Sequence, residues 1–303
     1  MLQAINTKVL LSAVTILAAA AIAIGATFAF FSDTETSTGN VLAAGAIDLK
    51  VDNTCYYNGN ACVHGEFEGT DTRCSCTWEP TDLSEEHLFF DLSDIKPGDW
   101  EEDTISLAVE NNEAWLCADV TLTSDDDNSI TEPEAEDGDP DTAPGIGLGE
   151  LADAVNFYWW ADDGDNVFEC VMEQTSEGLV CNPDAEGSEH LLPAGPMGNL
   201  DVDETATVAL ADSDENIWGL PGPIPQGGET FYIGKAWCFG DSDMTPYPQG
   251  EQSGPDERPV TCDGSDVNNI TQTDSFTADI AFRAVQARNN DEFQCEVPTP
   301  TPS

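Results

Sequence analysis

The stretch TISLAVENNEAWLCADVTLT, residues 104–123, carries the pattern that decides the fold. Its first half alternates apolar Ile105, Leu107 and Val109 with polar neighbours, and the alternation resumes over residues 116–122. Side chains of a strand point to opposite faces in turn, so an apolar residue at every second position indicates a half-buried strand. Two such runs on either side of a turn predict a pair of antiparallel strands.

The same alternation continues before and after this pair. It recurs in residues 47–52, 208–210, 231–239 and 276–284, which are separated by stretches rich in Gly, Pro, Asn and Asp. Alternating strands joined by such turns are typical of an antiparallel sandwich or barrel. A single short helix is expected, over residues 150–155.

The charge of the chain limits its function. The sequence of 303 residues has 59 acidic and eight basic side chains, a formal net charge of −51. Without a basic stripe to neutralise phosphates, a nucleic-acid partner is excluded. The repulsion among the acidic side chains must be offset by screening ions or bound cations. This requirement fits a salty habitat or a surface rich in divalent cations. Because 40% of the residues are hydrophobic, a folded core is nevertheless expected.

The first residues predict export from the cytoplasm. Lys8 precedes an apolar run over residues 9–31, as in a secretory signal. The run is also long enough to span a bilayer, so an uncleaved membrane anchor is the alternative. Gly25 interrupts the run, and Thr27 and Ala29 provide the small residues that a signal peptidase reads, which favours cleavage after Ala29. Cleavage would remove no acidic residue.

Cysteine usage supports an exported protein. An even number of cysteines outside the cytoplasm indicates disulfides. Cys55 with Cys62 and Cys170 with Cys181 are the plausible local bridges, because each pair closes a short loop containing turn residues. The sequence does not determine the pairing. Cys74 and Cys76 form a tight pair, but no second such pair and no histidine motif lies at the spacing of a zinc site. The ten cysteines are Cys55, Cys62, Cys74, Cys76, Cys117, Cys170, Cys181, Cys238, Cys262 and Cys295.

One acidic loop is the best candidate for binding calcium. Asp162, Asp163, Asp165, Asn166 and Glu169 place side-chain oxygens around a glycine turn, and calcium prefers six to eight oxygen ligands. The alternative is an acidic turn that closes a hairpin, in which Asp and Asn cap the backbone. The acid-rich stretch of residues 125–141 is expected to be a solvated loop, with residues 125–127 a weaker calcium candidate.

Several motifs make the chain recognisable. Residues 25–35 (GATFAFFSDTE), residues 45–49 (GAIDL) and residues 94–112 resemble the TasA/camelysin family. The resemblance implies that a SipW-type signal peptidase is a partner and cuts between Ala29 and Phe30, after the Thr27–Ala29 triplet. Three later segments, residues 159–166, 232–240 and 282–290, are similar to large bacterial and archaeal members carrying such signals.

The resemblance also implies a fold and an assembly. The expected fold is a jelly-roll-like antiparallel β-sandwich with long acidic loop insertions and at most one or two short helices. Members are secreted and often polymerise into surface or matrix fibres. The mature N-terminal segment, residues 30–46, would add as a strand to a neighbouring subunit through Phe30, Phe31, Val41 and Leu42. The alternative is that this segment is an unstructured leader.

Because the camelysin branch is metalloprotease-like, an enzyme has to be considered. Zinc hydrolases commonly place two histidines and a carboxylate on one helix face. His64, His87 and His190 are far apart in the sequence, and none belongs to such a motif. No motif for a nucleophilic serine or cysteine is present either. The expectation is therefore that the protein is not an enzyme.

The remaining features complete the prediction. Asn269 begins a glycosylation sequon. The tryptophans Trp159, Trp160 and Trp237 have apolar neighbours and are expected to pack in a core, with a sugar-binding platform as the alternative. Residues 30–296 are expected to form a single domain, followed by a Pro/Thr tail over residues 297–303. The predicted function is a secreted structural subunit of surface or biofilm-matrix fibres that polymerises with itself. The alternative is a monomeric calcium-dependent surface adhesion or binding module, which could stay membrane-bound through an uncleaved N-terminus.

Overall fold

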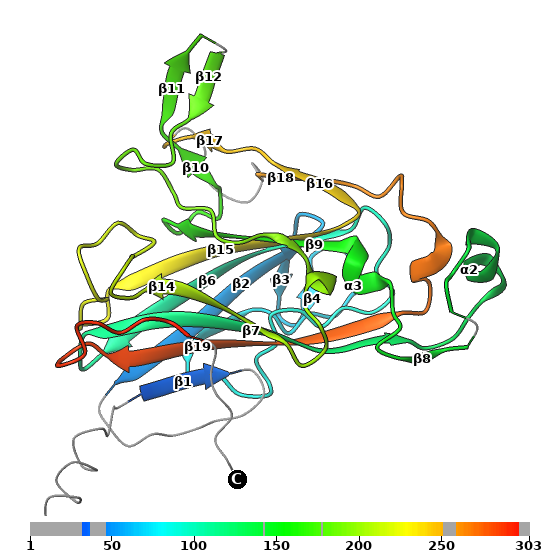
Figure 1. Ribbon diagram of the computed structural model, residues 1–303, viewed down its shortest axis with the longest axis horizontal. Helices are drawn as coiled ribbons and strands as arrows, with labels where there is room; N and C mark the ends of the chain where they lie inside the picture. The colour runs from blue at the N-terminus through cyan, green and yellow to red at the C-terminus, as the bar shows by residue number, and fades with distance from the viewer. Residues whose placement is uncertain (1–31, 37–46, 142, 177, 251–258, 297–303) are drawn as a thin grey trace, which may run out of the picture. The chain divides into compact units, whose positions relative to one another are not determined.

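A computed structural model describes residues 32–36, 47–141, 143–176, 178–250 and 259–296, with the backbone alone for the first of these ranges. The chain from Ser32 onward forms one compact unit. Its strands are mostly paired antiparallel and make two larger sheets (Figure 1). The all-β sandwich expected from the alternating pattern is confirmed.

The first sheet has the strand order β1–β19–β7–β14, and β8 pairs with the end of β7. Its central strands are β19 and β7, so β1 and β14 form its two edges. The bounds are Ser32–Thr36 for β1, Ser275–Gln286 for β19, Ala114–Asp127 for β7, Thr205–Ala211 for β14 and Gly145–Ile146 for β8.

The second sheet has the order β13–β9–β15–β6–β2–β3–β4, and β5 pairs with β2. Its long central strands are those predicted from alternation, together with β9. The bounds are Gly195–Pro196 for β13, Val155–Asp162 for β9, Thr230–Phe239 for β15, Trp100–Glu110 for β6, Asp48–Tyr57 for β2, Asn60–Val63 for β3, Glu66–Phe67 for β4 and Trp78–Thr81 for β5.

Small elements decorate the two sheets, and the β11–β12 hairpin projects away from them (Figure 1). The short strand pairs are β10 (Glu169–Cys170) with β17 (Tyr247–Pro248), β11 (Met172–Thr175) with β12 (Gly178–Cys181), and β16 (Asp241–Met244) with β18 (Val260–Asp263). The helical segments are α2 (Glu132–Asp137), α3 (Leu151–Ala154), η1 (Met197–Asn199) and η3 (Asn269–Thr271).

The main core lies between the sheets and is built by the alternating residues. Ile105 and Leu107 of β6 and Leu116 of β7 are completely buried, together with Ile233 of β15 and Phe282 of β19. Burying one such side chain contributes about 1.5–3 kcal/mol relative to leaving it exposed. The predicted strand pattern therefore identifies the residues that hold the two sheets together.

The helices partly correct the expectation. α3 confirms the short helix predicted over residues 150–155. The loop expected over residues 125–141 is wrong as to secondary structure, because β7 ends only at Asp127 and α2 follows it. Most residues of this stretch are nevertheless exposed or partly exposed. A capping box starts α2, in which the buried Glu134 carboxylate accepts a hydrogen bond from the Thr131 N–H. Pro133 lies in the first turn, where its missing N–H costs nothing.

Five disulfides pair all ten cysteines. The predicted bridge between Cys170 and Cys181 is confirmed, but the one between Cys55 and Cys62 is wrong. The sulfurs of Cys55 and Cys62 lie within 4.8 Å of one another, but the segment from Cys74 to Cys76 supplies a partner for each. The bridges are Cys55–Cys76, Cys62–Cys74, Cys117–Cys295, Cys170–Cys181 and Cys238–Cys262.

Candidate functional site

Part of the predicted donor segment lies on a sheet edge. β1 pairs antiparallel with β19 over five residue pairs, from Ser32 opposite Val285 to Thr36 opposite Ala281. Because β19 pairs with β7 on its other side, β1 covers the edge that β19 would otherwise present. The side chains predicted for cleavage and polymerisation lie outside the described residues: Thr27, Ala29, Phe30, Phe31, Val41 and Leu42.

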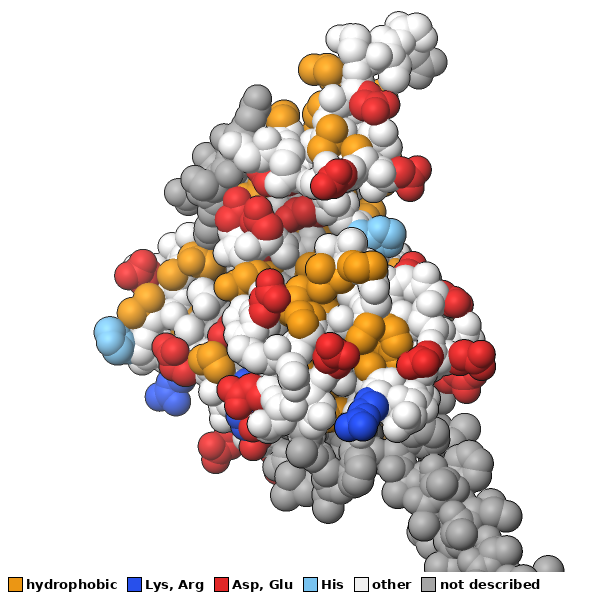
Figure 2. Space-filling view, turned by 90° about the vertical axis from the view of Figure 1, so that its left-hand side faces the viewer, with side chains coloured by type: hydrophobic (Ala, Val, Ile, Leu, Met, Phe, Trp, Pro, Cys, Tyr) orange, Lys and Arg blue, Asp and Glu red, His pale blue; other side chains and the backbone are white. Residues whose placement is uncertain are grey.

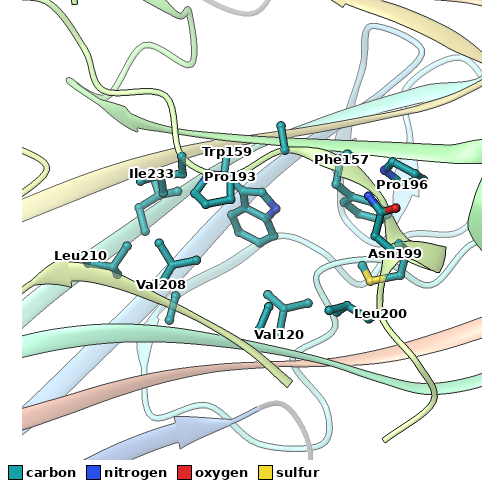
Figure 3. A pocket seen from close by; sticks show the side chains of 16 residues that line it. Val120, Phe157, Trp159, Pro193, Pro196, Asn199, Leu200, Val208, Leu210 and Ile233 are labelled. Carbon is teal, nitrogen blue, oxygen red and sulfur yellow. The ribbon is translucent and has the colours of Figure 1, made fainter. Parts of the chain in front are cut away.

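An apolar cavity of about 250 Å³ opens between the sheets beside the other edge strand, β14. Val208 and Leu210 of β14 line one side of it, and Phe157 and Trp159 of β9 lie on the other (Figure 3). Asn199 adds one amide to a lining that is otherwise apolar or aromatic. The cavity therefore suits an apolar group.

The loop predicted to bind calcium follows β9 directly and is closed by its own hydrogen bonds. Asp162 Oδ2 accepts from the backbone N–H groups of Gly164 at 2.9 Å and Asn166 at 3.2 Å. Its other oxygen accepts from Trp160 Nε1 at 3.0 Å. Asp165 Oδ1 accepts from the N–H two residues further on at 3.0 Å. These contacts are those of an acidic turn that caps its own backbone.

Glu189, which sequence reasoning did not connect with this loop, joins the two ends of it. Its carboxylate accepts from the N–H of Asp163 at 3.0 Å and from the N–H of Glu169 at 2.7 Å. Burial raises the pKa of Glu189 to about 9, and the charges of Asp162 and Asp163 add to the rise. Burial also raises the pKa of Asp162 to about 6. The loop therefore holds two carboxyl groups that resist ionisation.

Of the three remaining predicted calcium ligands, Asp163 is exposed, whereas Glu169 and Asn166 are buried. Glu169 accepts hydrogen bonds from Gln249 Nε2 at 2.9 Å and from the Gly250 N–H at 2.8 Å. Asn166 is 1% exposed, and its side-chain amide has no hydrogen-bond partner among the described residues. Calcium at this loop stays a prediction, and most of the carboxylate oxygens are already used by N–H donors.

A second carboxylate cluster lies between the end of β7 and the start of α3. Asp139, Asp141 and Glu150 each bring one oxygen within 4.8 Å of the other two. Burial raises the pKa of Glu150 to about 7, and Asp274 and Asp139 add to the rise. Asp127 is 4% exposed, and neither of its carboxylate oxygens has a hydrogen-bond partner in the part of the chain that is described. Oxygen ligands of this kind are those that calcium prefers.

Comparison with protein families finds one match. Residues 4–67 match the model of the camelysin family, which is described as a metallo-endopeptidase. The resemblance to the TasA/camelysin family is confirmed. The matched residues make up about a fifth of the chain and include most of its first 31 residues, β1 and the start of the second sheet. No curated protein matches the chain.

The camelysin match does not locate a catalytic site. It includes His64, which lies in an exposed turn, but ends before the other two histidines. His87 packs against Trp78 and contacts the hydroxyl of Ser84 at 2.9 Å, and His190 is exposed. Within the described ranges, the groups of ligand atoms close enough to share a metal contain no histidine. The expectation that the protein is not an enzyme stays a prediction.

Acidic side chains outnumber basic ones on the face in Figure 2. They form separate patches scattered over this face, with few Lys or Arg and a group of hydrophobic side chains near its middle. Trp160 and Trp237 are buried, as expected for core residues, whereas Trp159 lines the apolar cavity.

Asn269 is exposed in η3 and donates to the Asp137 carboxylate at 2.8 Å. No helix in the described residues is long and apolar enough to cross a membrane.

Proposed function

We propose that this protein is a secreted structural subunit of extracellular surface or matrix fibres. In this proposal a SipW-type signal peptidase cleaves after Ala29, and the new N-terminal segment of one subunit pairs with the next. The observation that carries the proposal is the pairing of β1 with the edge of β19. The camelysin match over residues 4–67 supports an extracellular protein of this type.

The pairing of β1 explains how one segment can serve either within a subunit or between subunits. Strand addition at a sheet edge gains main-chain hydrogen bonds, which do not depend on side-chain identity. In a single chain, residues 32–36 occupy the β19 edge of their own sheet. The same register is available to residues 32–36 of a second copy once the local strand is released. Growth would then repeat at each new subunit.

Cations have a proposed part in this assembly. Neighbouring subunits each carry a charge near −50, and their repulsion opposes close packing unless ions screen it. Calcium bound at either carboxylate cluster would remove part of this charge. We therefore propose that filament growth depends on divalent cations, with calcium as the first ion to test.

Negative-stain electron microscopy tests the proposal. Protein beginning at Phe30 is compared with protein lacking residues 30–46, each with and without millimolar calcium. Filaments from the first protein alone would support strand donation. Single particles under all conditions would contradict the fibre proposal and favour a monomeric surface-binding module.

A point variant separates strand pairing from bulk loss of the segment. Thr34 lies in the middle of β1, where a proline has no N–H to donate and is poorly tolerated within a paired strand. Thr34→Pro should prevent filaments, whereas the matched Thr34→Val variant keeps the N–H and a β-branched side chain and should form them. A synthetic peptide of residues 30–46 should also stop growth by occupying the acceptor edge. Equal assembly by both variants would contradict strand donation.

A further inference from the structure

The inner face of the second sheet contains a lysine and two acids where apolar residues are expected. Ile105 and Leu107 of β6 point into the core, and the residues two and four positions before Ile105 on the same face are Asp103 and Glu101. On the neighbouring strand β15, Lys235 lies directly opposite Asp103 in the register. The side chains of Lys235, Asp103 and Glu101 are all completely buried.

These three groups are in close contact. Lys235 Nζ lies 2.6 Å from Asp103 Oδ2 and 3.7 Å from Glu101 Oε2. The lysine also donates to the carbonyl of Phe89 at 3.3 Å and lies over the ring of Phe90, 5.5 Å from its centre. The amine is therefore held against one carboxyl group, with a second one next to it and no access for bulk water.

Both carboxyl groups are oriented by further buried donors. Asn53 Nδ2 donates to Asp103 Oδ1 at 2.7 Å, so Oδ2 is the oxygen that faces the lysine. Trp237 Nε1 donates to Glu101 Oε2 at 2.5 Å. Glu101 Oε1 has no hydrogen-bond partner among the described residues. Burial and the charge of Asp103 raise the pKa of Glu101, which favours its protonated form.

A simple structural role does not account for this arrangement well. Desolvating an ion pair commonly costs as much as the attraction gains, and apolar residues in its place often give equal or greater stability. Few lysines and arginines offset the many acids of this chain, yet Lys235 is placed where it cannot reduce surface repulsion. A metal site is also disfavoured, because the third group near Glu101 and Asp103 is Cys55, whose sulfur is in a disulfide.

We propose that Lys235 and Asp103 form an intramolecular amide bond that joins β15 to β6, with Glu101 transferring the protons. An amine held against a carboxyl group by the folded chain reacts as if at very high concentration, with effective molarities of about 10⁵–10⁸ M in well-oriented cases. Exclusion of water removes competing hydrolysis. The fold therefore supplies the positioning, and no external reagent is needed.

Formation of the amide releases one water molecule. A proton passes from Lys235 Nζ to Asp103 Oδ2, which converts the ion pair to a neutral amine and a neutral acid. The Nζ lone pair attacks Asp103 Cγ and forms the new N–C bond, while Glu101 donates its proton to the carboxyl group and takes one from Nζ. The Cγ–Oδ2 bond then breaks and Oδ2 leaves as water. Oδ1 becomes the amide oxygen and keeps its hydrogen bond from Asn53.

The product would be a covalent cross-link within the second sheet. β6 and β15 are adjacent central strands of the second sheet, joined in the register from Thr230 opposite Ala108 to Cys238 opposite Trp100. An amide between them survives reducing conditions that would open the five disulfides. This inference does not depend on fibre formation, and a monomer would carry the bond as well.

The mass of the unmodified chain tests the inference without any variant. Folded protein is denatured, its disulfides are reduced and alkylated, and the intact mass is compared with the mass from the sequence. The expected result is a deficit equal to one water molecule. Digestion after acidic residues should then release a branched peptide in which the segments containing Lys235 and Asp103 remain joined. A mass equal to that of the sequence would overturn the inference.

Two variants assign the roles. Glu101→Gln should leave the Lys235–Asp103 contact in place but abolish the mass deficit or slow its appearance at least tenfold after refolding. Glu102→Gln, one position along β6 and on the opposite face of the sheet, is the matched control and should keep the deficit. A deficit equal to ammonia would instead identify Asn53 as the partner and overturn the assignment to Asp103. An unchanged rate in Glu101→Gln would overturn the proton-transfer role.

Discussion

Removing the disulfide between Cys117 and Cys295 should destabilise the protein more than removing the one between Cys170 and Cys181. The first closes a loop with a sequence separation of 178 residues and the second a loop of 11. With the chain-entropy relation, these separations correspond to about 5 and about 3 kcal/mol of stabilisation. The expected difference between the two double Cys→Ala variants is therefore about 2.5 kcal/mol.

The two bridges are well matched for this comparison. In each pair one cysteine is fully buried and the other is partly exposed, so the loss of packing is similar. Cys117 lies in the central strand β7, whereas Cys181 ends the projecting β11–β12 hairpin. Urea unfolding followed by tryptophan fluorescence measures the shift in midpoint for each variant. Equal shifts, or a larger shift for the hairpin bridge, would refute the reasoning from loop length.

Three further measurements test the core and the two acidic sites. Leu107→Ala should lower the free energy of unfolding by about 2–5 kcal/mol because Leu107 is completely buried, and Leu179→Ala, at 67% exposure, should change it little. Folding raises the pKa of Glu189 from 4.5 to about 9, so its contribution to stability is present below pH 4.5 and is lost as the pH rises through 9. The fall in unfolding free energy between pH 5 and pH 9 should therefore be smaller in Glu189→Gln than in the parent protein, and an equal fall would contradict the assignment. Calcium at about 100 times its Kd should add about 2.7 kcal/mol. Calorimetry should show that Asp141→Asn loses more of this calcium-dependent stabilisation than Asp165→Asn, because the Asp165 carboxylate of the parent protein already caps the backbone. If calcium does not stabilise the parent protein, both sites are excluded.

The strands were predictable because burial follows their period. Residues 105, 107 and 109 are all buried in β6, and the alternating segments at 47–52, 231–239 and 276–284 lie within or next to the observed strands. The alternation of apolar and polar residues cannot reveal a polar residue that lies on the core-facing side of a sheet. Lys235 occupies a core position of β15, and its burial depends on Asp103, which is far away in the sequence. Only the strand register brings the two together.

The acidic sites show the same limit. The residues of the 162–169 loop were identified because they are adjacent in the sequence, but Glu189, which closes the loop, is not. The cluster of Asp139, Asp141 and Glu150 joins residues around α2 and α3, and α2 was itself missed because its acidic composition suggested solvent. In a chain with 59 acids, the pattern of charge alone cannot separate buried carboxyl groups from solvated ones.

The arrangement of edges allows strand donation to continue from one subunit to the next. A donated N-terminal strand and an acceptor edge are different surfaces, so subunits can join head to tail as well as by reciprocal exchange in a twofold dimer. A contact between different surfaces either closes into a ring or continues without limit. An incoming strand takes the place of β1 at the β19 edge, so the receiving subunit's own N-terminal segment is released for the next subunit. Light scattering should therefore show a mass that keeps increasing with concentration, and a plateau at twice the subunit mass would indicate reciprocal exchange in a closed dimer and contradict filament growth.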